Sequence, residues 1–124
     1  YDLRDFVALV SYLRSPRGCP WDQVQTHESI RRNFLEETYE ACEAIDAGDL
    51  VHMREELGDV LFAAVKVGRF CGVDPEAALS KTCEKFIARF RKVEETVNAR
   101  GEDMSALPLD ELMALWNDAK EQLR

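Results

Sequence analysis

Two short acidic patterns inside strongly helical sequence constrain this chain more than any other feature. The first is Glu36-Glu37-x-x-Glu40, and the second, Glu56-x-x-Asp59, begins sixteen residues after Glu40. Because an α-helix turns by about 100° per residue, residues three apart project into one sector about 60° wide. The paired carboxylates of each pattern are therefore expected on one side of their helix.

The apolar neighbours of these carboxylates make the patterns unusual. On a helical wheel Glu37 shares its sector with Phe34 and Ala44, and Glu56 shares its sector with Val60 and Ala63. A charge on an apolar stripe is very costly unless something compensates it. We therefore expect a divalent cation among these carboxylates.

The chemistry of the side chains narrows the choice of cation. Ligand sets made only of oxygen favour Mg²⁺ or Mn²⁺ over zinc, which prefers nitrogen and sulfur. A di-iron carboxylate bundle uses a Glu-x-x-His pair from each of two helices. The two histidines of the chain, His27 and His52, do not follow a glutamate at that spacing. Mg²⁺ is therefore the expected cofactor, with Mn²⁺ as the alternative.

Hydrophobic periodicity and turn-forming residues predict an all-α fold. The expected helices cover about 3–13, 27–47, 50–71, 75–100 and 109–123, and residues 15–26 and 101–108 are expected to form loops. The two or three residues between the second and third helices make these an antiparallel hairpin, which brings the acidic patterns face to face. We predict one domain over residues 1–124, a bundle of about five helices completed by a homodimer or higher oligomer.

Composition excludes several classes of protein. A net charge of −8 argues against a general nucleic-acid binder, and the chain has no run of about 18 apolar residues that would cross a membrane. The N-terminus shows no signal-peptide pattern. The four cysteines are widely spaced, so we expect Cys42, Cys71 and Cys83 to be buried thiols of a protein in the reducing cytoplasm.

Five segments form a combination of motifs: Cys19-Pro20-Trp21-Asp22 followed by Gln25-Thr26, LEETYE (35–40), EELGDVLF (55–62), KFIARFRKVEE (85–95) and Met113-x-x-Trp116-x-x-x-Lys120. Together these motifs resemble those of the MazG nucleoside triphosphate pyrophosphohydrolases. The match extends over almost the whole chain. The acidic signature is shared by a wider all-α superfamily, whereas its combination with the other motifs is much more specific.

The resemblance implies a Mg²⁺-dependent enzyme that converts a nucleoside triphosphate and water into a monophosphate and pyrophosphate. The implied metal ligands, which also form the catalytic set together with Glu36, are Glu37, Glu40, Glu56 and Asp59. The implied substrate-binding residues are Asn33, Glu37, His52, Asp59, Lys85, Arg89, Trp116 and Lys120. His52 departs from the family pattern, since a lysine is usual at that position.

Some assignments stay open at the level of sequence. Glu36 lies toward the solvent edge of its helix, where it could be an outer metal ligand, a base that activates water, or a solvated residue. Trp116 fits either base stacking or a core or dimer-interface position. The competing functions are a phosphoribosyl-ATP or pyrimidine dNTP-specific pyrophosphohydrolase, and a non-catalytic Mg²⁺–nucleotide-binding helical module.

Overall fold

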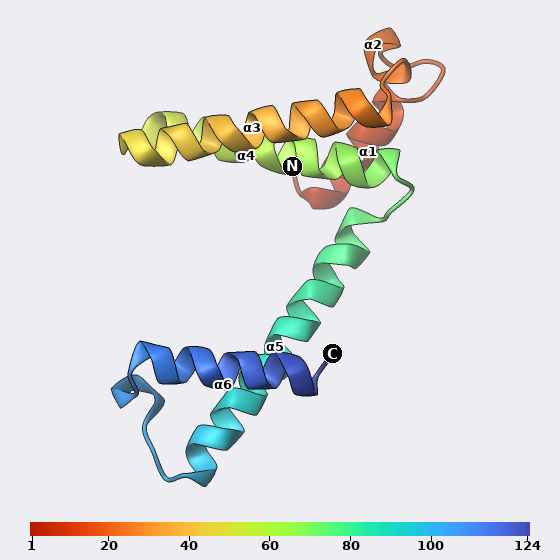
Figure 1. Cartoon of the computed structure of the whole chain (residues 1–124). Coiled ribbons are helices and arrows are strands. Elements are labelled where there is room, and N and C mark those ends of the chain that lie inside the picture. The colour runs from red at the N-terminus through yellow and green to blue at the C-terminus, as the bar shows by residue number, and fades with distance from the viewer. The chain divides into compact units, whose positions relative to one another are not determined.

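The computed structural model describes all residues, 1–124, and consists of helices without any strand (Figure 1). The α-helices are α1 (Leu3–Leu13), α2 (Pro20–Gln23), α3 (His27–Ala47), α4 (Leu50–Phe70), α5 (Pro75–Ala99) and α6 (Leu109–Gln122), and a 3₁₀-helix, η1, covers Met104–Ala106. The all-α prediction is confirmed, and each of the five expected helices is present. The sixth, α2, is a single short turn in the segment expected to be a loop.

Local capping explains where the helices of the hairpin begin and end. The Thr26 side chain accepts a hydrogen bond from the Ser29 backbone N–H and thereby starts α3. Gly48 ends α3 in the left-handed conformation, at φ 67°, which costs glycine little because it has no Cβ. Asp49 then caps α4 by accepting from the N–H groups of Val51 and His52. The chain thus reverses within two residues, as the sequence predicts.

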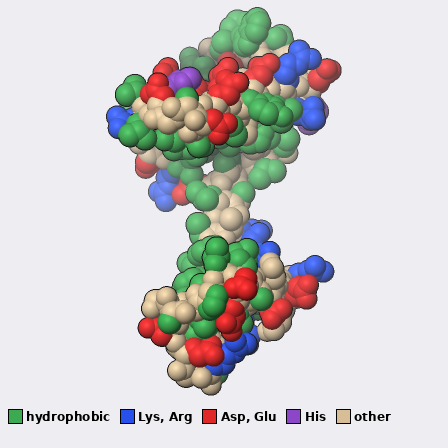
Figure 2. Space-filling model, turned by 60° about the vertical axis from the view of Figure 1, so that its left-hand side comes forward, with side chains coloured by type: hydrophobic (Ala, Val, Ile, Leu, Met, Phe, Trp, Pro, Cys, Tyr) green, Lys and Arg blue, Asp and Glu red, His purple; other side chains and the backbone are tan.

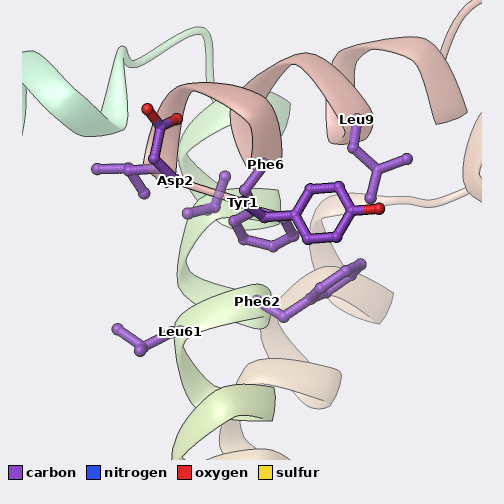
Figure 3. Close-up of a pocket in the computed structure, with 8 residues that line it drawn as sticks. Tyr1, Asp2, Phe6, Leu9, Leu61 and Phe62 are labelled. Carbon is purple, nitrogen blue, oxygen red and sulfur yellow. The ribbon is translucent and has the colours of Figure 1, made fainter.

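The chain divides into two compact units, residues 1–77 and 78–124. In the first unit α3 and α4 lie side by side, and α1 packs against α4 (Figure 1). Phe6 of α1 and Phe62 of α4 meet with their ring centroids 4.6 Å apart. Figure 3 shows these two rings close together, with Tyr1 beside them. The buried side chains of this unit are Val10, Ile30, Ala44, Glu56, Ala63 and Val65.

An ion pair and a cation–π contact fasten the segment that contains α2. The Asp22 carboxylate lies 3.4 Å from the Lys66 ammonium of α4, and their side chains are only 13% and 19% exposed. The Arg14 guanidinium lies 4.5 Å from the centre of the Phe70 ring and donates to the Asp22 carbonyl at 3.2 Å. These contacts hold the short α2 turn against the end of the hairpin.

The second unit consists of most of α5 together with η1 and α6. Its core is formed by Val93 and Val97 of α5 and by Leu115 and Ala119 of α6. Three partly buried side chains, Met104, Leu107 and Trp116, pack against this core. An ion pair at 3.0 Å joins Arg100, directly after α5, to Glu111 of α6.

Much apolar surface remains exposed in the single chain. Leu57 and Leu61 of α4 are 57% and 61% exposed, and Figure 2 shows hydrophobic side chains over a large part of the visible surface. The prediction that Cys42, Cys71 and Cys83 are buried is wrong for the single chain, because all three are exposed thiols. Cys42 and Cys83 lie on exposed sides of α3 and α5, and Cys71 follows the end of α4. No helix is both long and apolar enough to span a membrane.

Candidate functional site

Three carboxylates from the two acidic patterns meet across the α3–α4 hairpin. One oxygen from each of Glu37, Glu56 and Asp59 lies within 4.8 Å of the other two. Glu37 comes from α3, whereas Glu56 and Asp59 come from successive turns of α4. The hairpin thus brings together residues about twenty positions apart in the sequence, as the antiparallel arrangement predicts.

Glu56 is the buried member of this group and the only buried charged residue of the chain, with an exposed fraction of 7%. One of its oxygens, Oε1, lies 2.8 Å from Nε2 of His52, one turn earlier on α4. The other oxygen, Oε2, is buried and has no hydrogen-bond partner. A buried carboxylate oxygen without a partner is energetically costly, so this atom suits a positive or hydrogen-bond-donating group.

Glu37 and Asp59 complete the group from more accessible positions. Glu37 is half-buried, and the Asn33 side-chain amide donates to its Oε1 at 3.1 Å. Asp59 is exposed and lies three residues after Glu56. Solvent therefore reaches the group from the side of Asp59, whereas the side of Glu56 is buried.

These residues fit a divalent cation. Three carboxylates bring three negative charges within a small volume, and all the available ligand atoms are oxygens. Such a set suits the hard cations Mg²⁺ and Mn²⁺. The unpartnered Oε2 of Glu56 supplies independent support, since a cation would give this oxygen the partner that it lacks.

The other two acidic candidates lie outside this group of three. Glu36 is exposed and lines a cavity of about 250 Å³ together with Trp21, Asn33 and Lys66. Glu40 is exposed on α3, one turn after Glu36. The roles predicted for both residues stay predictions. Lys66 was not among the residues singled out from the sequence, because a lone lysine on a helix gives no signal of a cavity.

The predicted phosphate contacts belong to the second unit. Arg89 and Lys120 line one cavity of about 420 Å³, and the Nε atom of Arg89 is buried without a hydrogen-bond partner. Trp116 packs against Phe86 with ring centroids 5.2 Å apart, whereas Lys85 is exposed. The structure thus brings Arg89 and Lys120 together, and their participation in the same site as the carboxylates stays a prediction.

The fold and the site together define a class of protein: an all-α protein with a candidate cation site made only of oxygen ligands. Residues 25–94 match the family described as the MazG nucleotide pyrophosphohydrolase domain. The chain therefore belongs to the MazG family. This range contains all three grouped carboxylates and extends through most of α5.

Individual relatives agree with this membership. A nucleoside triphosphate pyrophosphohydrolase of Mycolicibacterium smegmatis is 40% identical over 97% of the chain, which covers 36% of that relative. A protein of Bacillus subtilis named uncharacterized protein YabN is 34% identical over 98% of the chain, which covers 24% of it. The chain thus spans about a quarter to a third of the length of these curated relatives.

A solved structure supports the fold. The crystal structure of a mazG-related protein from Thermotoga maritima superimposes with a TM-score of 0.64 and 27% sequence identity. The alignment covers 96% of this chain and 99% of the other. The similarity thus includes both compact units.

If Glu56 is a cation ligand, the variant Glu56→Gln should change how the unfolding temperature responds to a divalent cation. In EDTA this variant should unfold at the same temperature as the wild type or higher, because it removes a buried charge that faces two others. Addition of Mn²⁺ should raise the unfolding temperature of the wild type but not that of the variant, since a ligand stabilises the state that binds it. Differential scanning calorimetry with and without Mn²⁺ measures both effects. An equal rise for both proteins would contradict the site.

Proposed function

We propose that the chain is a Mg²⁺-dependent nucleoside triphosphate pyrophosphohydrolase that releases a nucleoside monophosphate and pyrophosphate. The observation that carries the proposal is the group formed by Glu37, Glu56 and Asp59 around the unpartnered Oε2 of Glu56. Membership of the MazG family and the names of its relatives support the same reaction. The physiological role that we propose is removal of unwanted nucleotides from the cellular pool.

The reaction places specific demands on these residues. Water attacks the α-phosphorus, the bond from this phosphorus to the oxygen that bridges to the β-phosphorus breaks, and pyrophosphate leaves with that oxygen. A divalent cation supplies charge neutralisation of the phosphate oxygens and lowers the pKa of water. In our proposal Glu37, Glu56 and Asp59 hold the cation from two helices, and Glu40 adds a fourth carboxylate.

We propose that Glu36 accepts the proton of the attacking water. It is exposed at the edge of the cavity that Asn33 also lines, and Asn33 donates to Glu37 of the carboxylate group. A carboxylate at this edge can accept a proton without being a metal ligand. Asn33, on the wall of this cavity, is proposed to contact the substrate.

We propose that Lys85 and Arg89 contact phosphate groups of the substrate, as the family resemblance implies. Lys85 and Arg89 are four residues apart on α5, so they project toward one side of the helix. Lys120 shares the cavity of Arg89, and the buried Nε of Arg89 lacks a partner that a phosphate oxygen would provide. Trp116 is proposed to contact the base, although its packing on Phe86 also serves the core of this unit.

Product analysis with a panel of NTPs and dNTPs in Mg²⁺ tests the reaction. We expect monophosphate and pyrophosphate from several nucleotides. Turnover of a single pyrimidine dNTP, or of phosphoribosyl-ATP alone, would favour the specific enzymes named as alternatives. Nucleotide binding without turnover would favour a non-catalytic module, and release of diphosphate and orthophosphate would contradict the proposal.

The variants Glu37→Gln and Glu56→Gln should each lower kcat by more than about 100-fold, the upper end of the loss seen for changes in the surroundings of metal ligands. Glu55→Gln is the matched control, because Glu55 adjoins Glu56 in the sequence but is exposed. This control should keep near-normal rates. Rates close to wild type in either test variant would show that the ligand assignment is wrong.

Replacement of Arg89 tests the polyphosphate contact. Arg89→Gln should raise the KM for NTP by about 10-fold or more, since hydrogen bonds to charged groups contribute about 1.5–3 kcal/mol. The control is Arg91→Gln, an exposed arginine on the same helix. Steady-state kinetics at saturating Mg²⁺ separates KM from kcat. An unchanged KM in Arg89→Gln would place Arg89 outside the substrate site.

We further propose that a second copy of the chain covers the apolar surface of α1 and α4. Leu9, Leu57 and Leu61 are all more than 45% exposed, and a cavity of about 590 Å³ lies between Leu9 and Leu61 (Figure 3). Large exposed apolar patches mark association surfaces, and pairing a patch with itself gives a closed dimer.

Light scattering after size-exclusion chromatography tests this association. The wild type should have at least the mass of a dimer, and Leu61→Glu should shift the mass toward the monomer because it puts a charge into the interface. Leu109→Glu is the matched control, since Leu109 is an exposed leucine of the second unit, outside this surface. A monomeric wild type would refute the proposal.

A further inference from the structure

We propose that His52 is a positioning residue that orients Glu56 for the cation and does not bind a substrate phosphate. The inference rests on the proposed function, because it concerns the same carboxylate group. It differs from the role that the family resemblance implies for position 52, where a lysine is usual.

The contact between the two side chains is short, and the two side chains differ in their exposure to solvent. Nε2 of His52 lies 2.8 Å from Oε1 of Glu56, four residues further along α4. The His52 side chain is about half exposed, whereas that of Glu56 is almost fully buried. Nε2 carries a proton in the charged imidazole and in one neutral tautomer, so the contact needs no particular charge on His52.

This contact decides which oxygen of Glu56 is left for a cation. With Oε1 held by His52, the remaining oxygen, Oε2, is the buried atom without a partner. The carboxylate cannot rotate freely while Oε1 is fixed. His52 therefore leaves one defined oxygen available as a ligand, as outer partners of metal ligands commonly do.

The backbone of His52 is itself fixed. Its N–H donates to the Asp49 side chain at 3.1 Å, as part of the cap that starts α4. The imidazole thus extends from a tethered first turn toward a glutamate one turn later. A residue whose backbone is held in this way is suited to orient a neighbour, because no further backbone freedom is lost when the contact forms.

The opposite helix repeats the same arrangement. The amide of Asn33 donates to Oε1 of Glu37, again four residues further along, at 3.1 Å. Each helix of the hairpin thus supplies a glutamate to the group and, one turn before it, a side-chain nitrogen close to one glutamate oxygen. This repetition argues that the His52 contact belongs to the site and is not an incidental surface pair.

The test measures Mn²⁺ affinity of the full chain without nucleotide, by calorimetric titration. His52→Ala should weaken Mn²⁺ binding by about 10-fold or more, the usual loss when an outer partner of a ligand is removed. His52→Gln should recover most of the affinity, because a glutamine amide can donate to a carboxylate four residues away. Circular dichroism in EDTA should show that both variants are folded.

The matched control is Glu28→Gln, which breaks the exposed pair of Glu28 with Arg32 at the same spacing on α3. It should leave Mn²⁺ affinity unchanged. Wild-type affinity in His52→Ala would overturn the inference, and a rise in the KM for NTP alone would assign His52 to the phosphates instead. Coupling of Mn²⁺ to an imidazole nitrogen in pulsed EPR, lost in His52→Gln, would also overturn it by making His52 a ligand.

The wild type and Glu56→Gln separate this inference from the proposed function. Failure of the wild type to bind Mn²⁺ would overturn the metal site and the positioning role together. Binding by the wild type that is lost in Glu56→Gln but unchanged in His52→Ala would overturn only the role of His52.

Discussion

The first unit depends on how the charge of one buried carboxylate is compensated. Glu56 is almost inaccessible to solvent, yet Glu37 and Asp59 bring two further negative charges close to it. Only one of its oxygens has a protein partner, His52. An arrangement of this kind is unfavourable by itself, because the charges repel and the free oxygen has lost its water. The arrangement is consistent with a divalent cation site, because a cation bound there would turn the repulsion into attraction.

The hairpin makes this grouping possible. Gly48 and Asp49 reverse the chain within two residues, so that α3 and α4 present their acidic patterns to each other. The same caps fix the first turn of α4, on which His52 lies. The helix caps at the turn thus contribute to the geometry of the site. Strengthening or weakening these caps would change the turn and the site together.

Most of the secondary structure could be predicted because its signals are local. Thr26 and Asp49 start helices and Gly48 ends one at the positions that the sequence indicates. The short α2 was missed, since its stability depends on contacts remote in sequence. The Asp22–Lys66 ion pair is such a contact, and no sequence pattern predicts it.

Acidic residues on apolar helix stripes, joined by a two-residue turn, were sufficient to predict a carboxylate group and the type of cation that suits it. The tertiary structure decided which members meet: Glu37, Glu56 and Asp59 form the group, while Glu40 is exposed on α3 and lies outside it. It also decided the partner of His52. Helical periodicity fixes only the sector of a side chain, whereas the distances between atoms depend on how the two helices pack and on which rotamers that packing allows.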